Sequence, residues 1–164
     1  MNNLLLYIAK KVSSLCPETR CFALKRALYR LAGVKIGKNV RITSSATIIG
    51  ASELSIGDNT WIGHQALIVC SAPIKIGKNC GIAPRVYIGT GTHEIDRETP
   101  GILGKGISMP ITIEDGCWLC VNSTILYGTT IADHSIIAPG AVVKGNVPSY
   151  ELWGGCLAKK IKNL

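Results

Sequence analysis

Aliphatic residues recur at every sixth position over most of this chain, and no other feature restricts its fold as strongly. They form five groups of three: Ile36, Ile42, Ile48; Ile56, Ile62, Ile68; Ile76, Ile82, Ile88; Ile113, Leu119, Ile125; and Ile131, Ile137, Val143. A spacing of six matches neither the alternation of an ordinary strand nor the 3.6-residue period of an amphipathic helix. The spacing therefore indicates an internal repeat of the β-helix type.

Two further positions of each six-residue unit predict a thin prism with tight corners. Small residues stand four positions after eleven of the aliphatics: Val40, Ala46, Thr60, Ala66, Cys80, Val86, Cys117, Ser123, Thr129, Ser135 and Ala141. Asn or Gly stands three positions after seven of them: Asn39, Asn59, Asn79, Gly116, Asn122, Gly128 and Gly140. Small side chains fit inside a narrow corner, and Asn and Gly tolerate the positive φ of a tight turn. Three units per coil predict an all-β, triangular parallel β-helix of about five coils.

The repeat stops at Ile88 and resumes only at Ile113. We expect segment 89–112 to form a long loop inserted after the third coil, because its polar, Gly- and Pro-containing sequence has no period. A repeat protein that admits one long insertion usually has a functional reason for it. The candidate for that function is His93.

The chain divides into three parts around the repeat. We expect an N-terminal helical segment over 1–33, the β-helix over 34–147, and a basic tail over 148–164. In the first part apolar residues repeat at helical spacing, Pro17 interrupts them, and Gly33 stands where a glycine would end the second helix.

The formal net charge of +8 is concentrated at one end of the chain. Residues 1–41 hold nine Lys or Arg against one acid, Glu18, whereas the rest of the chain has nine of each. Two interpretations remain open: a solvated basic face on helices that cover the prism end, or a basic amphipathic arm on an anionic membrane. No nucleic-acid partner is expected, because the segment lacks the interleaved aromatics on which single strands stack.

The cysteine content indicates a reducing compartment. The seven cysteines are an odd number without the spacing of a secreted disulfide framework, and the N-terminal sequence lacks the features of a signal peptide. The apolar run before Lys10 is too short for a membrane-spanning helix. We expect a cytoplasmic protein, located at the inner face of the membrane if the second interpretation of the N-terminal charge holds.

Four motifs make the chain resemble the hexapeptide-repeat acyltransferases. They are Ile82-Ala83-Pro84, Gly91-Thr92-His93, Met109-Pro110-Ile111-Thr112-Ile113 and Cys117-Trp118-Leu119. In this order they are similar to the galactoside, maltose and nodulation acetyltransferase branch, and the segment from Leu24 to Val34 is similar to acetyltransferases of surface-polysaccharide synthesis. The resemblance implies a left-handed coil, a homotrimer, and active sites between neighbouring subunits.

The resemblance also implies a reaction, the transfer of an acetyl group from acetyl-CoA to a hydroxyl of a sugar in capsule, O-antigen or exopolysaccharide synthesis. His93 matches the catalytic histidine of the family. An imidazole with a pKa near 6.5 is suited to take the proton of the hydroxyl, and such a base contributes about 10²–10⁴ in rate. An uninvolved histidine on a surface loop is the alternative.

Acetyl-CoA is expected to bind as a co-substrate, and no metal is expected. The candidate cofactor-binding residues are Trp118, Cys120, Val121, Ala138, Pro139, Lys144, Lys159 and Lys162. By resemblance, Trp118 lines the acetyl-CoA channel and the next four residues contact pantetheine from two successive corners. The three lysines are candidate counterions for the phosphate groups of coenzyme A. Interface packing for Trp118, and simple solvation for the lysines, remain open.

The acceptor is expected to contact residues of two turns. Pro84 and Arg85 precede the long loop, and His64 occupies an earlier turn. Arg85 stands at a corner position that normally holds Asn. Cys117 and Cys120 occupy different positions of the repeat, so we do not expect them to face each other as a redox or metal pair.

Other functions remain as alternatives. A β-helix carbonic anhydrase requires three zinc-binding histidines, two of them close in sequence, whereas His64, His93 and His134 are 29 and 41 residues apart. A non-catalytic scaffold or binding β-helix would need neither His93 nor the long loop. Transfer to the nitrogen of an amino sugar, or to a drug, would keep the chemistry and change only the acceptor.

Overall fold

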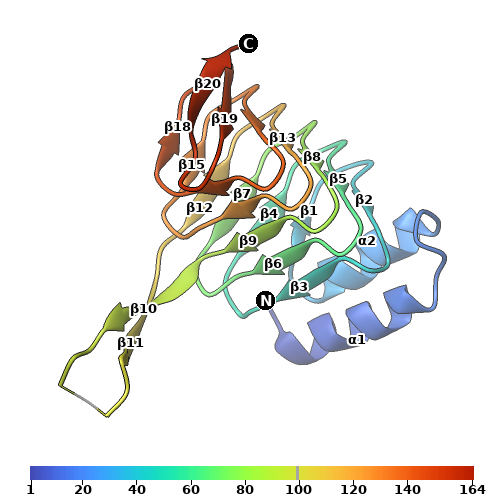
Figure 1. Ribbon diagram of the computed structural model, residues 1–164. Helices are drawn as coiled ribbons and strands as arrows, with labels where there is room; N and C mark the ends of the chain where they lie inside the picture. Colours follow the sequence, from blue (N-terminus) through green and yellow to red (C-terminus); the bar gives the residue numbers. More distant parts are fainter. Residues whose placement is uncertain (99) are drawn as a thin grey trace.

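Three parallel sheets wind into one left-handed β-helix in the computed structural model, which describes residues 1–98 and 100–164 (Figure 1). Sheet A contains β1 (Lys35–Ile36), β4 (Leu54–Ile56), β7 (Ile74–Ile76), β12 (Ile111–Ile113), β15 (Thr130–Ile131) and β18 (Asn146–Val147). Sheet B contains β2 (Arg41–Ile42), β5 (Trp61–Ile62), β8 (Gly81–Ile82), β13 (Trp118–Leu119), β16 (Ile136–Ile137), β19 (Glu151–Gly154) and β20 (Lys159–Asn163). Sheet C contains β3 (Thr47–Ile49), β6 (Leu67–Val69), β9 (Tyr87–Gly89), β14 (Thr124–Ile125) and β17 (Val142–Val143). We name the corners of the prism the A–B, B–C and C–A edges, after the sheets that they join.

The predicted β-helix is confirmed, and it is slightly longer than the repeat. Five coils have all three sides, and β18 and β19 add two sides of a sixth. The repeat does not reveal this coil because the spacing shortens to four residues between Val143 and Val147. Val147 pairs with Ile131 and Trp153 pairs with Ile137, so both continue the inner columns.

The positions of the six-residue unit take the roles that their residue types predict. All fifteen aliphatics of the repeat and all eleven small residues are buried. The seven Asn and Gly residues of the corners have φ between 54° and 71°. Along the A–B edge the Asn39 amide donates to Asn59, and Asn59 donates to Asn79 (N···O 3.3 and 3.1 Å). Stacked corners therefore support one another through side chains as well as through the backbone.

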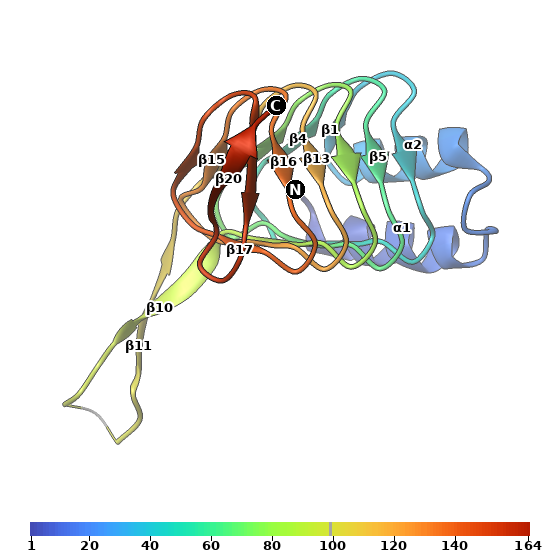
Figure 2. The ribbon, with the colours of Figure 1, turned by 45° about the horizontal axis from the view of Figure 1, so that its top comes forward.

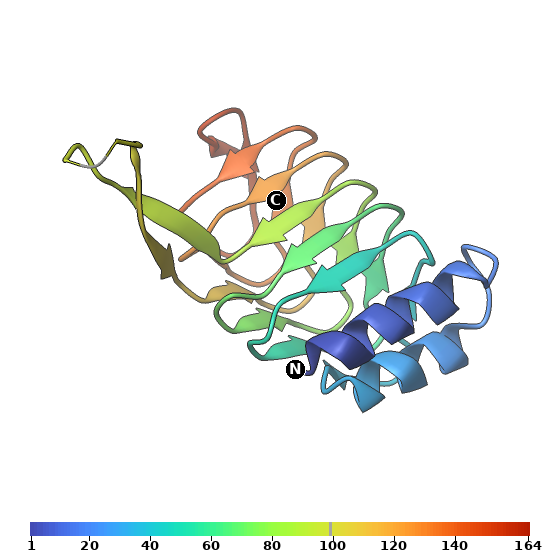
Figure 3. The ribbon, with the colours of Figure 1, turned by 90° about the horizontal axis from the view of Figure 1, so that it is seen from below.

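Two helices, α1 (Asn3–Ser14) and α2 (Phe22–Leu31), cover the open end of the first coil (Figures 2 and 3). The helical cover is as predicted, and its basic face is solvated only in part: Lys11, Arg20 and Arg30 are exposed, whereas Lys25 is buried. Lys10 Nζ donates to the carbonyls of Ser44 and Ala46 at 2.9 and 3.0 Å. Arg26 and Arg30 donate to carbonyls of the same coil, Arg26 to Val40 at 3.0 Å.

These contacts have a simple cause. The strands of the first coil have neighbouring strands on one side only, so the backbone groups on their other side lack hydrogen-bond partners. An unpaired carbonyl is costly when water is excluded from it. Cationic side chains on the covering helices supply the missing donors. None of the helices within the described ranges is long and apolar enough to cross a lipid bilayer.

Within segment 89–112, where a loop was predicted, residues 91–95 and 103–108 pair as an antiparallel hairpin. It contains β10 (Gly91–Ile95) and β11 (Leu103–Ser108), and it leaves the prism at the C–A edge (Figure 1). Residue 99, which belongs to the predicted loop, lies outside the described residues. The hairpin was hidden from sequence analysis because its strands pair with each other, so no inward face imposes a period on them.

Residues 148–164 extend sheet B. The chain passes through β19 and returns as β20, which pairs antiparallel with β19. Lys160 Nζ and Trp153 Nε1 both donate to the carboxylate of Glu151, and the bond from Trp153 measures 2.7 Å. These bonds lower the pKa of Glu151 below its ordinary value, with the bond from Lys160 as the largest cause.

Candidate active site

The hairpin that carries His93 is fastened to the prism by Thr90. This buried side chain accepts hydrogen bonds from the backbone N–H groups of Ser71 and Ala72 (2.8 and 2.9 Å), and its hydroxyl donates to the carbonyl of Val69 (3.1 Å). The N–H of Met109 donates to the Thr90 carbonyl at 2.9 Å and closes the neck of the hairpin. Sequence analysis did not single out Thr90, because a single threonine beside a glycine does not reveal which backbone groups its hydroxyl will reach.

His93 is exposed on β10, directly opposite Gly106 of β11. A β-carbon at position 106 would lie 3.7 Å from His93 Nε2, so the imidazole lies over the backbone of the glycine. Within the described residues no hydrogen bond to the imidazole is present. Of its acidic neighbours, Asp96 uses one oxygen to accept the N–H of Glu98 (2.9 Å). The ring nitrogens are therefore available to a substrate.

A pocket of about 340 Å³ surrounds this histidine. We call it the hairpin pocket; it is lined by Val69, Ser71, Gly91, Thr92, His93, Gly106, Ile107 and Ser108. Three of these side chains carry hydroxyl groups, which can donate to or accept from the hydroxyls of a sugar. An exposed imidazole beside hydroxyl-bearing side chains suits proton transfer to or from a small polar ligand.

A second group of predicted residues lies along the B–C edge. These residues are His64, Pro84, Arg85, Cys120, Val121, Ala138 and Pro139, from four coils. Backbone hydrogen bonds stack the coils: Arg85 N–H to His64 O at 2.8 Å, Asn122 N–H to Pro84 O at 3.1 Å, and Gly140 N–H to Val121 O at 3.0 Å. The edge is thus a continuous row that brings the predicted acceptor residues beside the predicted pantetheine residues.

Arg85 and His64 are held in place on this edge. Arg85 has φ 58° and donates from Nε to the side chain of Gln65 at 2.9 Å. The His64 ring lies 6.3 Å from that of Trp61, and its Nδ1 is buried without a hydrogen-bond partner in the described part of the chain.

Trp118 begins β13 on the outer face of sheet B and is 54% exposed. It lies over β8, because a β-carbon added to Gly81 would come within 3.4 Å of Trp118 Cδ1. A tryptophan exposed to this degree is an uncommon surface residue and a good wall for an apolar arm. Sequence analysis missed Gly81, which leaves the space that the indole covers.

The two cysteines beside Trp118 do not form a pair. Cys117 points into the prism and donates from Sγ to the carbonyl of Ala132 at 3.1 Å. Cys120 lies at the B–C edge, and burial raises the pKa of its thiol. A protonated thiol is a weak nucleophile, so Cys120 is not set up for attack on a thioester.

The predicted phosphate counterions are divided between two places. Lys144 lies at the C–A edge, where its Nζ donates to Tyr127 Oη at 2.8 Å and stands 4.5 Å from the ring centroid. Lys159 and Lys162 are exposed on β20, at the far end of sheet B from the helices. The last two therefore continue the surface of Trp118, whereas Lys144 shares an edge with the hairpin.

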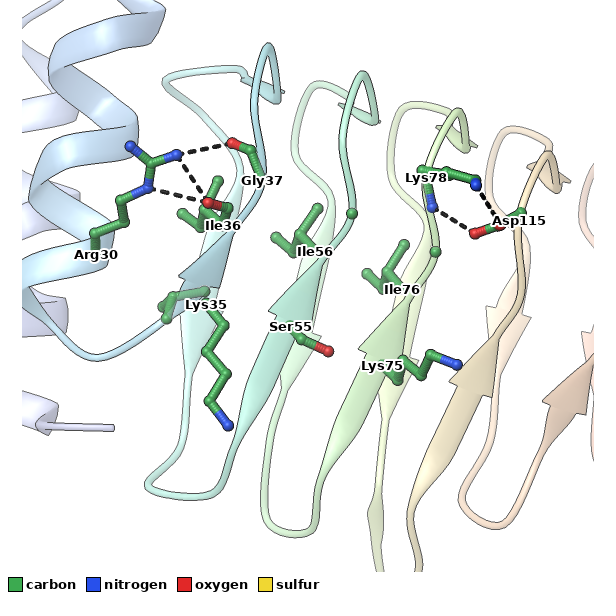
Figure 4. Close-up of a pocket in the computed structure, with 13 residues that line it drawn as sticks. Arg30, Lys35, Ile36, Gly37, Ser55, Ile56, Lys75, Ile76, Lys78 and Asp115 are labelled. Atoms are coloured by element: carbon green, nitrogen blue, oxygen red, sulfur yellow. Dashed lines mark hydrogen bonds and ion pairs between the residues drawn. The ribbon is translucent and has the colours of Figure 1, made fainter.

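A groove on sheet A contains none of the predicted site residues. It has a volume of about 590 Å³ and is bordered by Arg30, Lys35, Lys75, Lys78 and Asp115, among others (Figure 4). Its cations are engaged: Lys35 with Glu53, Lys75 with Glu114, Lys78 with Asp115, and Arg30 with the carbonyls of Ile36 and Gly37. We interpret this groove as structural.

One chain does not bring the two halves of the predicted site together. His93 and Lys144 lie at the C–A edge, and the B–C residues lie at the other end of the sheet C strands. Figure 1 shows the hairpin of β10 and β11 projecting away from β13 and the rest of sheet B. A site that uses both halves therefore needs a second copy of the chain.

The three histidines lie on three different edges. His134 is on the A–B edge, stacked on Tyr150 at 4.9 Å with its Nδ1 3.0 Å from Asp133. No grouping of three or more metal-binding side chains occurs in residues 1–98 and 100–164. A γ-carbonic anhydrase of Arabidopsis thaliana is nevertheless similar to this chain, at 38% identity over 55 residues, which cover 32% of this chain and 20% of that protein.

Two family profiles match the repeats on either side of the hairpin. The profile for the hexapeptide repeat of succinyl-transferase matches residues 53–90, and the profile for the bacterial transferase hexapeptide matches residues 110–145. Both describe the six-residue unit found in the coils.

Known proteins of this kind are similar over longer stretches. A Schizosaccharomyces pombe protein provisionally named an acetyltransferase is 36% identical over 83 residues, 51% of this chain and 40% of that protein. An Escherichia coli protein provisionally named a colanic acid biosynthesis acetyltransferase is 32% identical over 122 residues, covering 74% of this chain and 65% of that one. The chain thus spans less than two thirds of either relative.

A solved structure extends the similarity to nearly the whole chain. A hexapeptide-repeat acetyltransferase of Vibrio cholerae, crystallised with acetyl-coenzyme A, is 26% identical, with a TM-score of 0.79 over 99% of this chain and 86% of that one. The coils of the structure and the two matched profiles both identify a hexapeptide-repeat protein, and the chain is similar to acetyltransferases built from this repeat.

Proposed function

We propose that this protein transfers an acetyl group from acetyl-CoA to a hydroxyl group of a sugar, with His93 as the general base. The observation that carries the proposal is the exposed imidazole over Gly106, with free ring nitrogens in a pocket of hydroxyl-bearing side chains. The related Vibrio cholerae enzyme binds acetyl-coenzyme A, which supports the same donor for this chain.

The proposed reaction is a direct transfer in which all bonds are accounted for. A ring nitrogen of His93 takes the proton of the acceptor hydroxyl while the oxygen attacks the carbonyl carbon of the thioester. A backbone N–H stabilises the oxyanion that forms. The carbon–sulfur bond then breaks, the imidazolium returns its proton to the leaving thiolate, and an acetyl ester and free coenzyme A result.

The proposal includes a homotrimer, because the predicted site residues occupy two edges of one prism. The hairpin of one copy would reach the B–C edge of its neighbour, so that His93 of the first faces Trp118 of the second. A heterologous contact of this kind closes into a ring when the rotation is right, and three prisms side by side would form three equal sites.

Donor binding is assigned to the second half of that site. Trp118 would wall the channel, and Cys120, Val121, Ala138 and Pro139 would contact pantetheine along the stacked backbone of the B–C edge. Lys159 and Lys162 at the end of sheet B would neutralise the phosphate groups, and Lys144 would do so from the hairpin edge. Pro84, Arg85 and His64 remain the proposed acceptor contacts on the same edge.

The acceptor is proposed to be a glycan of surface-polysaccharide synthesis. The Escherichia coli relative carries the name of a colanic acid biosynthesis enzyme, and colanic acid is a surface polysaccharide. We place the protein in the cytoplasm, where thiols stay reduced and acetyl-CoA is available, and we include contact of its N-terminal segment with the inner face of the membrane. Transfer to the nitrogen of an amino sugar is the second candidate.

One substitution tests the catalytic assignment. His93→Ala should lower acetyl-CoA thiol release in the presence of acceptor by about 10²–10⁴, the usual contribution of a general base. His134→Ala is the matched control, since that histidine is exposed on another edge, and it should leave turnover within a few-fold of wild type. Turnover of His93→Ala within a few-fold of wild type would show that the assignment is wrong.

Mass spectrometry of polysaccharide precursors after incubation with acetyl-CoA would identify the acceptor. An ester product is cleaved by hydroxylamine under mild alkaline conditions, whereas an amide survives. A hydroxylamine-resistant acetyl group would favour the amino-sugar alternative. If no glycan is acetylated and no thiol is released, the result would favour the alternative of a non-catalytic scaffold or binding protein.

A further inference from the structure

The two N-terminal helices bury one lysine and leave much of their apolar side-chain surface exposed. Lys25 is fully buried, and its Nζ donates to the carbonyls of Pro17 and Glu18 at 3.2 and 2.9 Å. Seven large apolar side chains of this segment are exposed: Leu4, Leu5, Tyr7, Ile8, Leu15, Leu24 and Leu31. An ordinary helix on a globular protein keeps most of its large apolar side chains on the side that faces the core, so this much exposed apolar surface is unusual.

The exposed residues form one stripe on each helix. On α1 the buried side consists of Leu6, Ala9 and Ser13, and helical spacing places Leu4, Ile8 and Leu15 on the opposite side. On α2 the buried residues are Lys25 and Tyr29, and spacing places Leu24 and Leu31 on the other side. We call the two stripes together the end surface, defined by Leu4, Ile8, Leu15, Leu24 and Leu31.

The end surface faces away from the prism along its axis. Both helices lie side by side across the first coil, at the opposite end of the molecule from β19 and β20 (Figures 2 and 3). The sides of the prism remain clear of it, so contacts between neighbouring prisms and contacts of the end surface do not compete.

The exposure of this surface is large enough to require an explanation. Leu15 is 86% exposed, Leu31 is 74% exposed and Leu4 is 67% exposed. Single exposed leucines are ordinary, but apolar residues gathered on one face mark an interaction site. A partner that takes up apolar side chains at the end of the prism is therefore expected.

Charge decides which partner fits. Lys11 lies in the α1 stripe, three residues after Ile8 and four before Leu15, and Arg20 is exposed in the turn between the helices. The one acid of the segment, Glu18, is bound to the prism: its carboxylate accepts hydrogen bonds from the backbone N–H and the hydroxyl of Ser45, both at 3.0 Å. The end surface is therefore apolar and cationic. Two such surfaces repel each other, whereas anionic phospholipid attracts them.

We infer that the end surface rests on a lipid bilayer with anionic headgroups, so that the prism stands on its helical end. The leucines and Ile8 enter the boundary between headgroups and acyl chains, and Lys11 and Arg20 lie among the phosphates. This inference extends the membrane contact of the proposed function. Vesicle binding needs neither donor nor acceptor, so the inference and the acyl transfer can fail separately.

Vesicle flotation with the full chain tests the inference. The protein should float with vesicles that contain phosphatidylglycerol, and more weakly or not at all with vesicles of phosphatidylcholine alone. The triple variant Leu4→Ser, Leu15→Ser, Leu31→Ser should bind at least about tenfold more weakly, because it loses apolar area that the bilayer would bury. Lys11→Ala should bind anionic vesicles about fivefold more weakly and should leave binding to phosphatidylcholine unchanged.

A matched control separates position from general hydrophobicity. Leu157→Ser removes another leucine, 63% exposed, from the turn between β19 and β20 at the far end of the prism, and it should bind vesicles like wild type. The substituted residues are exposed, so all variants should keep the melting temperature of wild type.

Three outcomes would overturn the inference. The first is no flotation of the wild type with anionic vesicles. The second is equal loss of binding in the Leu157→Ser and triple variants. The third is self-association of the wild type in solution that disappears in the triple variant without vesicle binding, since the partner would then be a second copy of the chain.

Discussion

The contact between Trp118 and Gly81 shows how one glycine can decide the shape of a binding face. The indole occupies the space above β8 that a side chain at position 81 would fill. A glycine in the interior of a strand weakens it, and it is found where a ligand or another group approaches the backbone closely. A β-carbon at position 81 would only touch the indole, at 3.4 Å, so a side chain larger than that of alanine is needed to displace it.

Gly81→Val should raise the KM for acetyl-CoA about tenfold, because the γ-carbons of valine would push the indole from its place and remove an aromatic contact with the donor. The kcat should change little, since His93 belongs to another edge. Steady-state kinetics with varied acetyl-CoA measure both quantities. Trp118→Ala should show the same pattern. An unchanged KM in both variants would exclude Trp118 from the donor channel.

At the scale of an element, the position of His93 depends on how the hairpin is attached to the prism. Thr90→Val keeps the shape of the side chain but leaves the N–H groups of Ser71 and Ala72 without their acceptor. We expect a loss of about 1–3 kcal/mol in the free energy of unfolding. We also expect a fall in kcat of about tenfold to a hundredfold, because a small displacement of the base is costly.

Thr90→Ser separates position from packing, since it restores the hydroxyl without the methyl group. It should recover most of the lost kcat, and the KM for acetyl-CoA should stay constant in both variants. Urea denaturation and steady-state kinetics test these expectations. A Thr90→Val enzyme with normal kcat would mean that the neck of the hairpin does not position His93.

The A–B edge carries a pH-dependent element. Asp115 accepts the N–H of Lys78 at 2.9 Å, and this bond keeps the pKa of the carboxyl below its ordinary value near 3.8. A carboxyl with a lowered pKa in the folded state stabilises the fold above its unfolded pKa, and that contribution is lost as the pH falls through the folded value. Asp133, which accepts from Ser149 and His134, behaves in the same way.

The melting temperature should therefore be steady near neutral pH and fall as the pH drops below about 4. Asp115→Asn should be less stable than wild type at neutral pH, and its melting temperature should depend less on acid. Differential scanning calorimetry across this range would measure both effects. An equal acid dependence in wild type and variant would assign the loss of stability to other carboxyls.

At the scale of the whole molecule, the division of the site over two edges can be tested by mixing subunits. His93→Ala lacks the base, and Trp118→Ala lacks the wall of the donor channel, so each variant alone should turn over poorly at low acetyl-CoA. If the site forms between copies, a mixed assembly contains sites with both residues intact. Random pairing in equal amounts should restore about a quarter of wild-type activity.

Thiol release before and after joint unfolding and refolding of the two variants measures this recovery. Each variant refolded alone is the control and should gain nothing. Absence of recovery in a mixture shown to exchange subunits would place both residues of a working site in one chain, against the geometry of the two edges.

The coils could be predicted from the sequence because each constraint is local and repeated. An inner aliphatic, a small corner residue and an Asn or Gly with positive φ each leave a mark at a regular spacing, as Ile82, Val86 and Asn79 do in one coil. The sixth coil was missed because the spacing shortens to four residues between Val143 and Val147, and because a tryptophan, Trp153, stands where an aliphatic would be expected. The hairpin was missed because it has no buried face to create a period.

By itself, the sequence determined the coil: its period, its inner columns, its corners, and the position of the insertion that carries His93. Only the tertiary structure decided which residues share an edge, because that depends on the side of the prism reached by each coil and not on distance along the chain. The same holds for the N-terminal helices. Arg26 and Arg30 turn inward because the folded first coil offers unpaired carbonyls, and those acceptors do not exist until the coil has formed.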